Sequence, residues 1–139
     1  DPRVKRVIIN ILSQDDLTPL FTKIKENNKL CGISFCEHNE YDLIKDYFSK
    51  VDSVHLFTIQ PGAQGNPFRS EMLEYANRLK EDGFTGDIGI DGGVNMETLP
   101  LICKYPVDIA VVGSAIVRSQ NPELTYRELL DMAQTLLMK

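Results

Sequence analysis

The chain has 139 residues, of which 42% are hydrophobic and 25% charged, and its formal net charge is −5 at pH 7. This length and composition are typical of one globular domain with its own core. The acidic balance argues against a nucleic-acid partner, which requires a basic face, and no apolar run approaches the roughly 20 residues needed to span a membrane.

The first part of the chain alternates a predicted strand with a predicted helix, twice. Residues 4–11 are rich in Val and Ile and predict a strand. Residues 17–24 carry apolar side chains at helical spacing, and two asparagines at 27–28 end that helix. A second strand is predicted over 29–35, and an amphipathic helix over 41–48.

The same alternation continues to the end of the chain, with glycine or proline at most of the boundaries. In chain order we predict a strand over 53–59, a Gly- and Pro-rich loop over 60–67, a helix over 71–82, a strand over 87–90, a helix over 96–103, a strand over 107–112, a short helix over 113–117 and a helix over 123–138.

These five βα units in strict alternation predict a parallel sheet covered by helices. Right-handed crossovers leave two architectures open. One is a complete five-stranded doubly wound sheet. The other is a (β/α) TIM-barrel type of fold, in which this chain would supply five of eight βα units, since a closed barrel needs roughly 200 or more residues.

The segment over 88–94 is the most informative, because an apolar strand runs directly into Asp91, Gly92 and Gly93. Parallel α/β folds place their chemistry at the carboxyl ends of the strands, where Asp91 is expected to lie. The two glycines permit a tight turn and a close approach of the backbone to a ligand. An ordinary turn, in which Asp91 caps the next helix, is the alternative.

Glycine-rich turns also follow the neighbouring strands. Gly62 and Gly65 lie in the loop after the third strand, and Gly113 and Ser114 follow the fifth. Exposed backbone amides in such turns form a concavity that binds anions, and in barrels a phosphate commonly sits between the last two βα loops. The sequence therefore predicts a phosphate site at this edge of the sheet.

The three cysteines, Cys31, Cys36 and Cys103, are an odd number without CxxC spacing. Cys31 and Cys103 lie in apolar stretches and are expected to be buried free thiols. No pattern of a secretory signal opens the chain, so we expect a cytoplasmic protein. The chain starts with Asp rather than Met, and a strand pattern follows almost at once, so we expect it to be cut from a longer sequence.

A response-regulator receiver domain also has five βα units and an acidic pair near its first helix, as Asp15 and Asp16 would be. Such a domain needs an aspartate after the third strand and a lysine after the fifth. Gln60 and Gly113 stand there instead. The receiver interpretation fails, and the two aspartates are expected to cap the first helix.

Three motifs in order carry a resemblance: Pro61-Gly62-x-x-Gly65-x-x-Phe68, then residues 91–94 (Asp-Gly-Gly-Val), then residues 111–116 (Val-Val-Gly-Ser-Ala-Ile). Together they resemble the ribulose-phosphate 3-epimerase family, from about its fourth to its eighth βα unit. The similarity covers about residues 29–117, and residues 4–28 match by length and pattern. The resemblance implies a single partial barrel domain over 1–139, with the first three βα units missing.

That resemblance implies a ribulose-phosphate-binding barrel that inverts C3 of a pentulose 5-phosphate with two aspartates and a divalent metal. The metal would be zinc-like, with iron or manganese as alternatives. Asp91 matches the family's catalytic aspartate, which also ligates the metal. The resemblance assigns the phosphate and substrate to Gly62, Gly65, Gly92, Gly93, Gly113 and Ser114.

The family's second aspartate, its substrate serine and its two metal-ligating histidines belong to its first three strands, which the match does not include. Neither His38 nor His55 replaces those ligands. His38 is expected to be a solvated loop residue, and His55, which shares a strand face with Phe57 and Ile59, a core or interface histidine.

Three hypotheses remain open. The first is an epimerase that interconverts ribulose 5-phosphate and xylulose 5-phosphate. The second is a non-catalytic or truncated sugar-phosphate-binding partial barrel that pairs with another chain, because an open half barrel would expose a strand edge and an apolar face. A homo-oligomer is expected on the same ground. The third is another phosphosugar barrel enzyme, such as a synthase or lyase, that reuses the phosphate loops.

Overall fold

A computed structural model describes residues 1–60 and 66–138 of the chain. Its centre is a five-stranded sheet in the order β1-β2-β3-β4-β5, and all neighbouring strands are parallel. This order, in which every strand pairs with the next along the chain, is that of a singly wound barrel and excludes the doubly wound alternative. The strands are β1 (Arg6–Asn10), β2 (Leu30–Phe35), β3 (Ser53–Phe57), β4 (Asp87–Asp91) and β5 (Ile109–Val111).

Helices follow the strands as the sequence predicts, although several are short. The α-helices are α1 (Thr18–Glu26), α2 (Tyr41–Ile44), α3 (Glu74–Glu81), α4 (Leu99–Ile102), α5 (Ser114–Val117) and α6 (Pro122–Leu137). Within the described residues, four 3₁₀ turns accompany them: Ile11–Ser13, His38–Glu40, Lys45–Tyr47 and Ser70–Leu73.

Two predicted helices differ most from the structure, while the helix expected over 71–82 begins with a 3₁₀ turn, Ser70–Leu73, before α3. The single amphipathic helix expected over 41–48 is a succession of a 3₁₀ turn, the four-residue α2 and a second 3₁₀ turn. The helix expected over 96–103 is α4 alone, because Asn95 and Thr98 hold the preceding residues in turns by hydrogen bonds of their own. Periodicity locates a buried face in both places, but it does not fix the helix type or the first turn.

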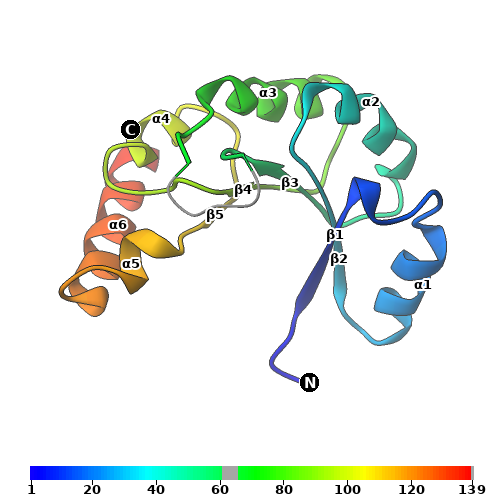
Figure 1. The fold of residues 1–139 in the computed structure, drawn as a ribbon, viewed down its shortest axis with the longest axis horizontal. Helices are drawn as coiled ribbons and strands as arrows, with labels where there is room; N and C mark the ends of the chain where they lie inside the picture. The colour runs from blue at the N-terminus through cyan, green and yellow to red at the C-terminus, as the bar shows by residue number, and fades with distance from the viewer. Residues whose placement is uncertain (61–65, 139) are drawn as a thin grey trace.

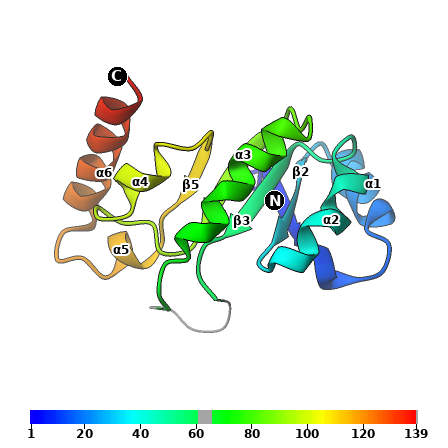
Figure 2. The ribbon, with the colours of Figure 1, turned by 90° about the horizontal axis from the view of Figure 1, so that it is seen from above.

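The helices lie in an arc around one side of the strands, from α1 through α2, α3 and α4 to α6 (Figure 1). The other side of the strands carries no helix in the part of the chain that the structure describes. Turned by 90°, α1, α2 and α3 follow one another across one side of the molecule, and α4, α5 and α6 lie together at the other end (Figure 2). This arrangement is half of a ring of helices around a curved sheet.

The two faces of the sheet differ in chemistry. The side chains that face the helices are apolar and fully buried, among them Ile33, Leu56, Ile88 and Ile90. Hydrophobic burial on this face is the main source of stability. The opposite face, called the polar face below, carries Asp87, Asp91 and the His55 ring, which packs directly over Gly89. Apolar side chains lie among these groups, such as Ile8 of β1 and Val111 of β5.

An ion pair shows that the polar face is concave. Arg6 of β1 donates from Nη2 to Asp87 Oδ2 of β4 at 2.5 Å. Three strand spacings of about 4.8 Å separate these strands along the sheet. The pair crosses that span because the sheet curls around its polar face, as barrel strands do.

Both edge strands leave apolar surface uncovered. Ile8 of β1 is 42% exposed and Val111 of β5 is 39% exposed. An apolar hollow runs beside each edge strand: Leu20 and Ile24 of α1 line the hollow at β1, and Leu130 of α6 lines the one at β5. The sheet is thus an open segment of a barrel.

The cysteines are free thiols, with Cys31 buried and Cys103 only partly buried, less than expected. The N-cap position of α1 is Leu17, without a side-chain cap, so the expected capping by Asp15 and Asp16 is not found there. Asp16, one residue earlier, accepts a hydrogen bond at Oδ1 from the Thr18 amide. None of the helices in the described part of the chain is long and apolar enough to cross a membrane.

Candidate active site

Asp91 is the last residue of β4, and it lies on the polar face at the carboxyl end of the sheet. β3 pairs with β4 on one side, and β5 pairs with it on the other, through Phe57 and Val111 opposite Asp91. Burial raises the pKa of the Asp91 carboxyl above its ordinary value, because the charged form loses hydration. A partly desolvated carboxylate is a stronger base than one in water.

A cavity of about 340 Å³ opens beside Asp91. Its walls come from three segments that are distant in the sequence, namely the loop after β3, the turn over 91–95 and the turn after β5. Gly92, Gly93, Gly113 and Ser114 all line it. The volume is within the range of small-molecule sites, about 300 to 1,000 Å³. The structure therefore brings together the predicted residues of strands four and five.

The turn after β4 requires both of its glycines. Gly92 has φ 112° and Gly93 has φ 70°, in the left-handed region that side chains disfavour. A Cβ on Gly92 would lie 2.5 Å from Ile59 Cγ1, and one on Gly93 would lie 3.0 Å from Phe68 Cδ2. The two glycines let the loop after β3 pack directly on this turn.

The turn after β5 is more open. A Cβ on Gly113 would meet nothing within 4 Å, and both Gly113 and Ser114 are exposed. Ser114 begins α5, which is the short helix expected from the sequence. In the described part of the chain, no packing contact demands a glycine at 113.

Gly62 and Gly65, the other predicted phosphate ligands, lie outside the described residues. The two ends of their loop are anchored, since the Asn66 side chain donates to the Gln60 carbonyl at 2.8 Å. The Arg69 amide donates to the Thr58 carbonyl at 2.7 Å and closes the base of the loop.

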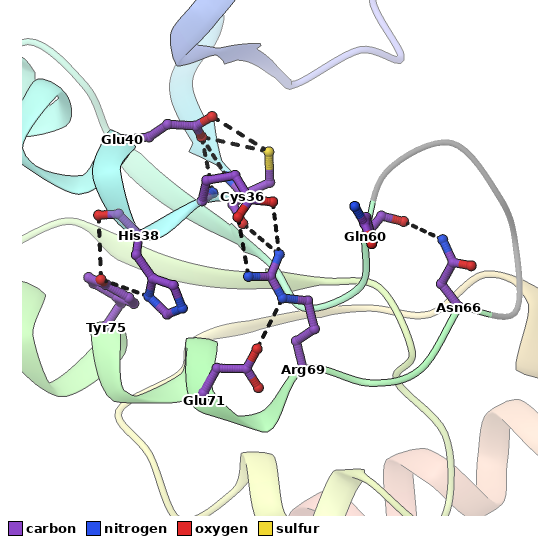
Figure 3. A network of polar contacts seen from close by, with 9 residues as sticks. Cys36, His38, Glu40, Gln60, Asn66, Arg69, Glu71 and Tyr75 are labelled. Atoms are coloured by element: carbon purple, nitrogen blue, oxygen red, sulfur yellow. Dashed lines mark hydrogen bonds and ion pairs between the residues drawn. The ribbon is translucent and has the colours of Figure 1, made fainter.

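Arg69 also joins this loop to the one after β2 (Figure 3). Its guanidinium donates to the Cys36 carbonyl at 2.9 Å and pairs with the carboxylates of Glu37 and Glu71 at 3.1 and 3.0 Å. These two carboxylates raise the pKa of the Arg69 guanidinium. The network holds the segment that leads from the cavity into α3.

The Cys36 thiol is a structural group. The backbone amide of Cys36 donates to Glu40 Oε2 at 2.8 Å, and Cys36 Sγ lies 3.6 Å from the same oxygen (Figure 3). Burial and the neighbouring carboxylate raise the pKa of the thiol to about 11. Because the thiolate is the nucleophilic form, Cys36 stays unreactive at neutral pH.

Neither histidine lines the cavity. His38 is exposed, as expected, and its Nδ1 lies 2.9 Å from the Tyr75 hydroxyl. His55 is a buried core residue, also as expected, with its Nε2 3.2 Å from Ser53 Oγ. Burial first, and then Arg6, lowers the pKa of His55 to about 4, so the ring is neutral at physiological pH.

The donor set for a metal ion is incomplete in the described residues, which contain no group of three or more His, Cys, Asp and Glu side chains that could hold one. Asp91 is the one acidic side chain among the residues that line the cavity over 1–60 and 66–138. A catalytic zinc needs about three protein ligands. The residues present therefore do not fit a complete metal site.

Four further residues, which the sequence pattern did not point to, also line the cavity: Ile59, Asn66, Phe68 and Asn95. Asn95 accepts hydrogen bonds at Oδ1 from the amides of Glu97 and Thr98. An asparagine directly after the Asp-Gly-Gly-Val motif, with a threonine three positions on, is a turn signal that could have identified this pair.

Comparison with known proteins identifies the family. A family model described as "Ribulose-phosphate 3 epimerase family" matches residues 3–117. Among curated proteins, the ribulose-phosphate 3-epimerase of Bacillus subtilis is 33% identical over 111 residues, which are 76% of this chain and 51% of that protein. The enzyme of the same name from Schizosaccharomyces pombe is 25% identical over 104 residues, 75% of this chain and 46% of that protein.

Solved structures give the fold. The chain superposes on 3-hexulose-6-phosphate synthase from Salmonella typhimurium with a TM-score of 0.71 and 17% identity, covering 96% of this chain and 62% of that one. Thiamine phosphate pyrophosphorylase from Pyrococcus furiosus gives 0.69 and 17%, with 96% and 61% covered. The fold is thus of the TIM-barrel type, five βα units in extent. The chain spans about half the length of the curated relatives it matches.

Proposed function

This chain belongs to the ribulose-phosphate 3-epimerase family, and from that premise we propose that it carries the Asp91 half of a site that epimerises pentulose 5-phosphates. The reaction would interconvert ribulose 5-phosphate and xylulose 5-phosphate. One observation carries the proposal: Asp91, Gly92, Gly93, Gly113 and Ser114 line one cavity at the carboxyl end of the sheet.

Asp91 would act as acid and base at C3. Inversion requires that one group remove the C3 proton, leaving an enediolate, and that a second group return a proton to the opposite face. The raised pKa of Asp91 suits the first of these roles, because a base is most effective when its pKa approaches the working pH. The second group, an aspartate by the resemblance, is not among the described residues that line the cavity.

The phosphate would bind to backbone amides and the Ser114 hydroxyl. Turns built from glycines present several N–H groups to one anion without side chains between them. The position of Gly92, Gly93 and Gly113 in the cavity wall supports this role for them. Gly62 and Gly65 are proposed on the resemblance alone. The 5-phosphate would thereby fix the sugar with its C3 near Asp91.

A divalent metal is proposed with Asp91 as one ligand only. The remaining ligands are not among the described residues of this chain, so we assign no step to the metal. If bound, such an ion would stabilise the negative charge that develops on the substrate oxygens. Which ion it is, zinc, iron or manganese, stays a prediction.

The direct test is an epimerase assay with ribulose 5-phosphate, using this chain and any longer protein that contains it. Asp91→Asn should lower turnover by about 1,000-fold or more, because amide nitrogen and oxygen do not accept the C3 proton. Asp131→Asn, an exposed carboxylate on α6, is the matched control and should retain full activity. Full activity in Asp91→Asn would contradict the proposal.

A second candidate is a sugar-phosphate-binding half barrel that pairs with another chain. The single carboxylate in the described cavity wall and the exposed apolar residues at both sheet edges favour it. Sedimentation of the chain should then show an oligomer or a complex. Binding of ribulose 5-phosphate without any turnover would support this candidate over the first.

A third candidate is a different phosphosugar enzyme. The chain superposes on the synthase and pyrophosphorylase structures, but at 17% identity this likeness shows the fold alone. Assays with other phosphorylated sugars separate this candidate from the first. The cytoplasmic location, the homo-oligomer and the absence of a nucleic-acid partner stay predictions.

A further inference from the structure

We propose that Thr58 and Thr98 are positioning residues that turn the backbone amides of Gly93 and Val94 toward the phosphate. Both threonines bind carbonyl groups of the turn that follows β4. Neither was assigned a role from the sequence. The inference rests on the proposed function of the cavity and adds the groups that orient its anion-binding amides.

Thr58 holds the first two carbonyls of the turn. It directly follows β3 and is fully buried. Its amide donates to the Asp91 carbonyl at 2.9 Å, and its hydroxyl donates to the Gly92 carbonyl at 2.6 Å. Because the Arg69 amide binds the carbonyl of Thr58 itself, this residue is fixed from two sides.

Thr98 holds the third carbonyl. Its hydroxyl donates to the Gly93 carbonyl at 2.8 Å and accepts from the Asn95 amide at 3.0 Å. A hydroxyl has one proton to donate, so the Gly93 carbonyl takes it. The Asn95 side chain accepts from the Thr98 amide at 3.0 Å in return, and the two side chains lock each other.

The amide directions follow from peptide geometry. A trans peptide is planar and its C=O and N–H groups point in opposite directions, and the described chain contains no cis peptide. With the Gly92 carbonyl held by Thr58, the Gly93 amide points away from Thr58. With the Gly93 carbonyl held by Thr98, the Val94 amide points away from Thr98.

These amides are available to a ligand. No hydrogen bond from the Gly93 or Val94 amide to another group is found over residues 1–60 and 66–138. Both residues line the cavity, with Gly113 and Ser114 among the other residues of its wall. Successive free amides in a turn with positive φ form the kind of concavity that holds a phosphate.

A substitution that keeps the shape of Thr98 but removes its hydroxyl tests whether the hydroxyl orients the peptide or the side chain only fills space. Thr98 is only partly buried, so Thr98→Val keeps its shape and removes the hydroxyl with little risk of unfolding. Thr98→Ser restores the hydroxyl. Thr22→Val is the matched control, because the exposed Thr22 hydroxyl makes the same kind of bond to a backbone carbonyl, that of Thr18, at 3.0 Å in α1.

The experiment combines crystal structures of wild type, Thr98→Val and Thr98→Ser with calorimetric titration of each by inorganic phosphate. We expect the Gly93–Val94 peptide to rotate in Thr98→Val and to keep its orientation in Thr98→Ser. Phosphate affinity should fall about tenfold in Thr98→Val and stay within about twofold of wild type in Thr98→Ser and Thr22→Val.

Two results would overturn the inference and are distinguishable. An unchanged peptide orientation or an unchanged phosphate affinity in folded Thr98→Val removes the positioning role while the proposed function stands. A wild-type chain that does not bind phosphate overturns the phosphate site itself, and the role of both threonines with it. Thr58→Ser against Thr58→Val repeats the comparison on the other side of the turn.

Discussion

The turns after β4 and β5 both contain glycine, but their surroundings differ. Gly92 and Gly93 lie at positive φ, with the loop after β3 packed against them and their carbonyls held by threonines. Gly113 lies at φ −106° beside an edge strand, with open space where its side chain would be. The turn after β4 is held in place because strands flank β4 on both sides. The turn after β5 is less constrained, because β5 has a neighbouring strand on one side only.

This difference separates two reasons for a glycine. At 92 and 93 the fold itself requires the absence of a side chain, because a Cβ would strain the backbone and meet Ile59 or Phe68. At 113 the described fold makes no such demand. A requirement for glycine at 113 would therefore reveal a ligand or a neighbour that approaches from outside.

The largest expected effect is at the packed turn. Gly92→Ala should lower the free energy of unfolding by about 4 kcal/mol, because it combines strain at φ 112° with a contact of 2.5 Å to Ile59. Urea denaturation measures the change. A loss below about 1 kcal/mol would mean that the turn is less constrained than the structure shows.

Acid sensitivity should come from the polar face of the sheet, where the His55 ring of β3 is buried. The pKa of His55 falls from 6.5 in the unfolded chain to about 4 when the ring is buried over Gly89. The unfolded chain then takes up a proton that the folded chain does not. The free energy of unfolding is therefore unaffected by His55 above pH 6.5. It falls by about 3 kcal/mol as the pH is lowered from 6.5 to 4.

Ring resonances of His55, followed by NMR from pH 7 to pH 4, test this directly. They should remain those of the neutral imidazole until the pH approaches 4. Protonation near pH 6.5 in the folded chain would contradict the burial of this ring. Asp87 opposes the shift and Arg6 adds to it, so Arg6→Gln should raise the pKa of His55.

A smaller effect is expected at Asp91. Its raised pKa means that the folded chain disfavours the charged carboxylate, which lowers stability at every pH above the unfolded pKa of about 3.9. Asp91→Asn should therefore raise the free energy of unfolding slightly at pH 7 and have no such effect at pH 3. Denaturation curves at the two pH values give the comparison.

The smallest stability effect is expected at the open turn. Gly113→Ala should change the free energy of unfolding by less than about 0.5 kcal/mol, because its Cβ meets no described atom within 4 Å. It should nevertheless weaken phosphate binding measurably, since the methyl group projects where the anion is proposed to lie. Unchanged affinity would remove Gly113 from the site.

Much of this arrangement was predictable. The alternation of apolar strands and helices fixed the order of the elements, and the acid and glycines after β4 indicated the carboxyl edge of the sheet. The segment over 41–48 shows the limit, because its apolar spacing is the same in one helix or in a chain of short turns. Backbone hydrogen bonds decide between these, and a pattern of side chains does not contain them.

Thr58 and Thr98 show the limit at the site. Their roles depend on which carbonyl each hydroxyl reaches, and residues 58 and 98 lie on different sides of one turn. No local pattern around Thr58 distinguishes it from other threonines that follow strands. The glycine positions were visible in the sequence, but the groups that orient their amides required the tertiary structure.

The most direct test of the site is an NMR titration of the ¹⁵N-labelled chain with ribulose 5-phosphate. The amides of residues 92–95 and of residues 113–114 should shift together, with one dissociation constant, because they line one cavity. The amides around the separate hollow lined by Asp15 and Asp46 should not move. Shifts confined to that hollow, or absent from both turns, would contradict the assignment of the cavity to a sugar phosphate.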